Sequence, residues 1–199
     1  MAGLFRTQLI ANRAVLAQAG GVEEPSRIAR LMADGDAARR DGRSADARHC
    51  FGEAVHACRE DGDLICEAHA LTRCAQVARD TGNLDWAIHD QQEAIALYRK
   101  AGAGPELAHA LRHAGEMFLE QQRHAHAATS LHEALDLYRA DAEAAPLDVA
   151  NALRAAALLA ETLDERDEAR RFWTDARSLY ESSCESGVVE ADQRLAALG

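Results

Sequence analysis

The chain has 199 residues, a length that suits one domain or one short repeat array with enough chain to bury a core. Hydrophobic residues make up 48% of it but aromatic residues only 5%, and the abundance of Ala and Leu favours helices over strands. The formal net charge of −11 argues against general affinity for nucleic acid or anionic lipid. No apolar run approaches the roughly 18 to 20 residues that a membrane span needs.

Residues 4–18 are the first expected helix, which we interpret as an N-terminal cap, with a dimer contact as the alternative. Apolar residues at three- and four-residue steps then predict four helix–turn–helix units followed by one last helix. The expected helices are 26–41, 44–60, 63–80, 84–100, 105–121, 124–140, 146–163, 166–184 and 187–198. The single domain is accordingly divided into 1–22, four repeats at 26–62, 63–103, 105–143 and 146–184, and a C-terminal capping helix at 187–199.

The second helices of the units share a motif that recurs every 40 to 42 residues. It reads Glu93-Ala-Ile-Ala-Leu-Tyr-Arg99 in the second unit and Glu133-Ala-Leu-Asp-Leu-Tyr-Arg139 in the third. Three prolines keep the same spacing just before the first helix of a unit, where a missing N–H costs nothing: Pro25, Pro105 and Pro146. Because one such unit cannot bury its apolar face alone, the units are predicted to stack.

These units resemble the tetratricopeptide repeat (TPR) family. The third unit matches the family pattern best, with Leu111, Ala114, Gly115, Phe118, Ala127, Leu131 and Ala134. The spacing exceeds the usual ~34 residues and is similar to the longer repeats of kinesin light chains and many bacterial proteins. The resemblance implies an all-α, right-handed superhelix (a solenoid), in which small residues such as Ala87, Ala127 and Ala169 let helices approach closely.

The resemblance also implies a concave groove, lined by the first helix of each unit, that binds a peptide or protein segment. The groove positions correspond here to Met32, Arg39, His69, Thr72, Gln76, Arg79, His109, Arg112, Glu116, Asn151, Arg154 and Leu158. Because Arg79, Arg112 and Arg154 fall on this surface, we expect a partner that carries acidic groups, and an ordinary solvated face is the alternative. The expected function is a scaffold or adaptor. A peptide- or ligand-sensing regulator and a self-associating subunit, as monomer or homodimer, are the alternatives.

We expect structural roles for the residues that could otherwise bind a metal or take part in catalysis. His109 and His113 are one helical turn apart, as two metal ligands would be, but the HExxH glutamate is missing, so we expect no metal or cofactor. No phosphate-binding loop or nucleophile elbow occurs, and the chain is not expected to be an enzyme.

Tyr98, Tyr138 and Tyr180 are expected to pack between repeats. Cys50, Cys58, Cys66, Cys74 and Cys184 form no CxxC pair, which predicts free thiols in a cytoplasmic protein. Lys100 as the only lysine is typical of a GC-rich bacterial genome.

Overall fold

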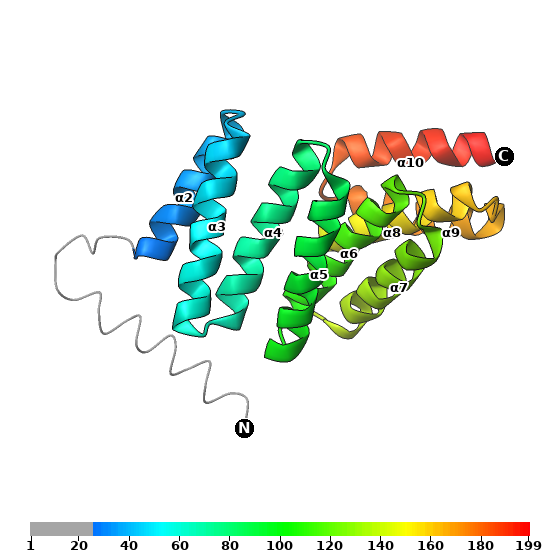
Figure 1. The fold of residues 1–199 in the computed structure, drawn as a ribbon. Helices are drawn as coiled ribbons and strands as arrows, with labels where there is room; N and C mark the ends of the chain where they lie inside the picture. The colour runs from blue at the N-terminus through cyan, green and yellow to red at the C-terminus, as the bar shows by residue number, and fades with distance from the viewer. Residues whose placement is uncertain (1–25) are drawn as a thin grey trace, which may run out of the picture.

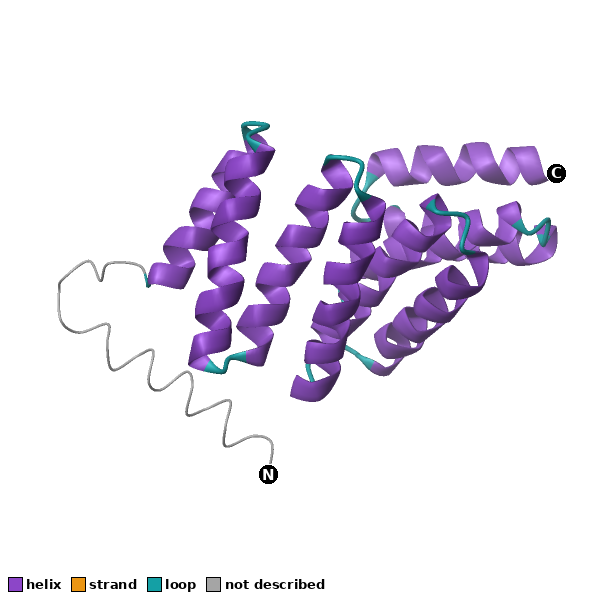
Figure 2. Cartoon of the chain, viewed as in Figure 1, coloured by secondary structure: helices purple, strands orange, loops and turns teal. Residues whose placement is uncertain are grey.

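The computed structural model describes residues 26–199, which form nine α-helices and no strand (Figures 1 and 2). The helices are α2 (Arg27–Arg40), α3 (Ser44–Asp61), α4 (Leu64–Asp80), α5 (Leu84–Ala101), α6 (Gly104–Glu120), α7 (His124–Ala140), α8 (Pro146–Thr162), α9 (Arg166–Tyr180) and α10 (Glu185–Leu198). None of them is both long and apolar enough for a membrane crossing. The predicted helix at 4–18 lies outside the described residues.

Consecutive helices pack in pairs, α2 with α3, α4 with α5, α6 with α7 and α8 with α9, and each pair packs against the next. Figure 1 shows α2 to α5 standing side by side and the later helices turning progressively, so that the stack twists along its length. The predicted all-α solenoid is therefore confirmed. Helix ends agree with the predicted ranges within two residues, except that α9 ends at Tyr180 instead of 184. It ends there because the N–H groups of Ser183 and Cys184 both turn back to donate to the carbonyl of Tyr180.

The turn inside each pair has one repeated geometry. The second residue after the first helix adopts a left-handed conformation in all four turns: Gly42, Gly82, Gln122 and Asp164, with φ between 58° and 76°. The next residue then donates to a carbonyl in the last turn of the helix, as Arg123 does to Phe118 at 2.8 Å. This backbone pattern ends the helix and reverses the chain. Gln122 and Asp164 show that the tertiary fold holds the turn even where glycine is absent.

The small residues predicted at the helix crossings are buried. Ala87, Ala127 and Ala169 are fully inaccessible, and the three repeated tyrosines are 1–6% exposed. The expectation that Tyr98, Tyr138 and Tyr180 contribute to packing is thus confirmed. The longer step between the third and fourth pairs comes from the loop 141–145, which replaces the two-residue links between earlier pairs.

Gly115 provides a test of the close approach between α6 and α7. A Cβ atom at this position would lie 2.6 Å from the Leu131 side chain. We therefore expect Gly115→Ala to lower the free energy of unfolding by about 1–3 kcal/mol through overpacking. The matched control is Gly52→Ala within α3, where a Cβ meets no atom within 4 Å and should stabilise the helix by about 0.5–1 kcal/mol. Urea unfolding measures both, and stabilisation by both substitutions would contradict this packing.

The cysteines differ from the expectation. Cys58 near the end of α3 and Cys66 near the start of α4 form a disulfide, with their Cα atoms 5.6 Å apart. Cys50, Cys74 and Cys184 are free. The prediction of five free thiols was wrong because the tight turn at Gly62 brings two residues from successive helices face to face. The cytoplasmic location stays a prediction, and it loses the argument that rested on the cysteines.

Candidate functional site

The first helices of the pairs hold the predicted groove residues, and a cavity of about 440 Å³ opens between α2, α4 and α6. Five of the predicted residues line this cavity: Met32, His69, Thr72, Gln76 and His109. Arg39 lines a neighbouring cavity of about 450 Å³ between α2 and α4, and Asn151 and Arg154 line one of about 270 Å³ beside α10. Five of the predicted groove residues thus line the cavity between α2, α4 and α6. Arg39, Asn151 and Arg154 line other cavities along the stack of helices.

The same central cavity contains residues that the sequence interpretation missed: Arg73, Tyr98, Pro105, Glu106 and Ala110. Tyr98 was assigned to packing alone, yet its ring also meets the His69 ring edge-on at 5.7 Å. Pro105 and Glu106 belong to the first turn of α6, which was treated only as a helix start. The recurring proline position was the signal that could have located this turn beside the groove.

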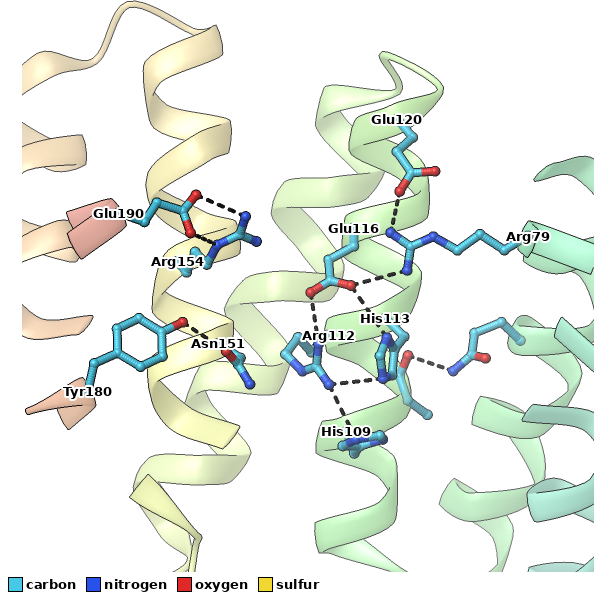
Figure 3. Close-up of polar contacts among 12 residues, drawn as sticks. Arg79, His109, Arg112, His113, Glu116, Glu120, Asn151, Arg154, Tyr180 and Glu190 are labelled. Carbon is cyan, nitrogen blue, oxygen red and sulfur yellow. Dashed lines mark hydrogen bonds and ion pairs between the residues drawn. The ribbon is translucent and has the colours of Figure 1, made fainter. Parts of the chain in front are cut away.

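Arg112 lies at the centre of a polar network on α6 (Figure 3). Its side chain is only 8% exposed, and its Nη1 donates to Glu116 at 2.8 Å. Its Nη2 lies 3.2 Å from Nε2 of His109 and 2.9 Å from Nε2 of His113. The Arg112 Nε is buried and has no hydrogen-bond partner among the described residues. Arg112 therefore belongs to an interior network and is not an open cation on the groove surface.

The two histidines of this network face a donor. Because a guanidinium only donates, the Nε2 atoms of His109 and His113 must accept, which places the ring proton of each neutral imidazole on Nδ1. Burial, followed by the neighbouring His113 and the charge of Arg112, lowers the pKa of His109 to about 4. Residues 26–199 contain no group of three or more His, Cys, Asp or Glu side chains placed to hold a metal ion.

Glu116 is the acceptor that this network surrounds. Burial alone would raise the pKa of Glu116, but the hydrogen bond from His113 and the charges of Arg112 and Arg79 outweigh it and lower the pKa to about 2. Arg79 reaches from α4 to this carboxylate at 3.4 Å and also pairs with Glu120 (Figure 3). Glu116 therefore stays ionised and joins α4 to α6.

The remaining predicted groove arginines are paired as well. Arg39 on α2 lies 2.6 Å from Asp80 at the end of α4. Arg154 on α8 makes two hydrogen bonds to Glu190 on α10, at 2.7 and 2.9 Å. Each of the four predicted arginines thus contacts a carboxylate of this chain. The prediction of an acidic partner remains untested, but an incoming carboxylate would have to displace one of these contacts.

Acidification should destabilise the chain through His109. The pKa of His109 is about 4 when folded and about 6.5 when unfolded, so between these values only the unfolded chain binds the proton and stability falls as the pH falls. Glu116 acts later, because its contribution is complete above about 4.5 and is lost as the pH falls toward about 2.

We therefore expect His109→Gln to flatten the pH dependence of the unfolding free energy between pH 6.5 and 4. Urea unfolding across this range measures the slope. The control His132→Gln replaces an exposed histidine on α7 and should keep the wild-type slope. A full wild-type slope in His109→Gln would contradict the burial of His109 in its neutral form.

No protein-family model matches the chain, and no curated protein matches its sequence. Solved structures do share its architecture, and the fold is that of a TPR-like helical solenoid. BtubC (BKLC) from P. vanneervenii aligns with a TM-score of 0.76 and 16% identity, over 84% of this chain and 70% of that chain. A Podosopora anserina putative kinesin light chain with nearly identical TPR-like repeats has a TM-score of 0.71 and 11% identity, over 89% and 87%. The MamA protein has a TM-score of 0.64 and 17% identity, over 86% and 80%. At these identities the likeness concerns the fold alone.

Proposed function

We propose that this chain is a protein-interaction module that holds a segment of a partner protein against the helices α2, α4 and α6, without catalysis. The observation that carries the proposal is the cavity of about 440 Å³ between these helices, where five of the residues predicted from the repeat pattern converge. Concave sites with a mostly apolar lining and a few placed polar groups are the usual form of a binding site. The TPR-like fold supports a protein partner by analogy only, since a fold alone does not define a function.

The cavity has the features of a pocket that receives one side chain of a bound segment. Met32, Pro105 and Ala110 supply apolar contact, and Tyr98 supplies an aromatic ring. Gln76 accepts hydrogen bonds from Arg39 and Arg73 through Oε1, and its Nε2, which has no partner among residues 26–199, could donate to a bound segment. A bound segment could therefore place a side chain in the cavity and have its backbone recognised at the rim.

Selection from a displayed random peptide library tests the proposal. Peptides that bind the wild-type chain should bind Thr72→Phe at least about tenfold more weakly, because the larger side chain occupies space in the cavity that a bound side chain needs. Thr174→Phe on α9 is the matched control. Both threonines donate to the carbonyl four residues before them, Ala68 and Arg170, and Thr174 is exposed away from the cavity. Failure to select any peptide, or binding that is unchanged in Thr72→Phe, would contradict the proposal.

A further inference from the structure

We infer that the cavity between α2, α4 and α6 selects a basic side chain, so that the partner presents a lysine or an arginine there. This inference rests on the proposed function and specifies the chemistry of the bound segment. It reverses the sign of charge that the arginines in the sequence predict for the partner.

The chain itself neutralises the cations of the groove. Figure 3 shows Arg79 and Arg112 directed to the carboxylates of α6, and Arg154 directed away to Glu190. Arg73, the one arginine in the cavity, lies 3.6 Å from Asp36 and donates to Gln76. None of these guanidinium groups is left without a carboxylate.

Glu106 stands in the first turn of α6. It lines the cavity, is partly buried, and has no ion-pair or hydrogen-bond partner among residues 26–199. His109, which lines the same cavity, is neutral near pH 7 because its Nε2 accepts from Arg112. The charged residues that line the cavity are Arg73 and Glu106, and Arg73 is paired with Asp36 of the neighbouring cavity, so Glu106 is the carboxylate that lacks a counter-ion there.

Part of the cavity lining is apolar. Met32, Pro105 and Ala110 contribute apolar surface to the same cavity as Glu106. Lysine and arginine carry an aliphatic stem that packs on apolar surface and a charged tip that seeks a carboxylate. A leucine would leave Glu106 covered without a partner, and a glutamate would oppose it directly. The net charge of −11 on the whole chain favours the encounter with a basic segment as well.

Nuclear magnetic resonance titration with four small probes tests the inference directly. The probes are the Nα-acetyl N-methylamides of arginine, lysine, norleucine and glutamate, each at millimolar concentration. The arginine and lysine probes should shift the amide resonances of cavity residues, such as His69 and Glu106, and bind about tenfold more tightly than norleucine. That factor corresponds to one charge-assisted contact at a partly exposed site. The glutamate probe should produce no shift.

Glu106→Gln keeps the shape of the side chain and removes its charge. It should weaken the arginine probe about tenfold and leave the norleucine probe unchanged. Glu185→Gln is the matched control, because Glu185 is also a first-turn carboxylate, of α10, and lies outside this cavity. The arginine affinity should be unaffected there.

Equal binding of arginine and norleucine, preference for glutamate, or no shift with any probe would overturn the inference. None of these results would reject the proposed function. Selected peptides that lose affinity in Thr72→Phe would still locate binding in this cavity. Selected peptides that bind Thr72→Phe normally would instead reject the proposed function itself.

Discussion

Replacing Arg112 with methionine should lower the free energy of unfolding by about 3 kcal/mol. Methionine approximates the aliphatic volume of arginine, so the main loss is electrostatic. Glu116 is 18% exposed and would keep its charge with one fewer guanidinium beside it. Removing one partner of a buried pair typically costs about 3–5 kcal/mol, and the low end applies because His113 and Arg79 remain near Glu116.

Two further variants separate this explanation from a general loss of packing. Arg154→Met removes an arginine whose side chain is 35% exposed in its pair with Glu190, and it should cost about 1 kcal/mol or less. The double variant Arg112→Met/Glu116→Leu removes both charges and should recover most of the stability lost by Arg112→Met. Chemical denaturation measures all three. Equal losses for Arg112→Met and Arg154→Met would show that the network is not buried as described.

Severing the Cys58–Cys66 disulfide should lower the free energy of unfolding by about 2–3 kcal/mol. The bond closes a loop of eight residues, for which the chain-entropy relation gives about 2.5 kcal/mol. The bond also joins α3 of the first helix pair to α4 of the second. Cys58 stands in the first unit where Tyr98 stands in the second, and a cysteine fills much less of the space between successive pairs. The covalent bond therefore takes the place of tyrosine packing in joining the first pair to the second.

Thermal and urea unfolding of Cys66→Ala, with Cys184→Ala as the control, test this effect. Wild type should lose the same stability in a reducing dithiol as Cys66→Ala loses without it, and Cys66→Ala should not respond to the reductant. Hydrogen exchange should accelerate in α2 and α3 more than in α6 and α7. A wild-type chain whose stability does not change under reduction would contradict a bond that joins these two pairs.

The parts of the fold that repeat could be predicted because the period is written in the sequence. Tyr98, Tyr138 and Tyr180 mark equivalent places, and the structure buries all three. The pairing of the arginines was also open to prediction, although it was missed. Arg39 and Asp80 are 41 residues apart, as are Arg79 and Glu120, so one repeat step brings each pair together. Periodicity locates contacts between repeats as well as elements within them.

Other features depend on geometry that the period does not contain. The disulfide depends on the turn at Gly62, which brings Cys58 and Cys66 from two successive helices within bonding distance. The charge around the cavity depends on which side chains form ion pairs, and the repeat period does not give those pairs. Arg73, which lines the cavity, follows the predicted groove residue Thr72 and is not itself a groove position of the family pattern. The repeat pattern therefore supplied five of the residues that line the cavity, but not the ion pairs in which the arginines take part.

A crystal structure of the chain with a selected peptide is the most direct test of the account. It should place the peptide along α2, α4 and α6, with one lysine or arginine side chain in the cavity beside Glu106. A peptide bound to the opposite face, along α3, α5 and α7, would contradict the proposed binding surface.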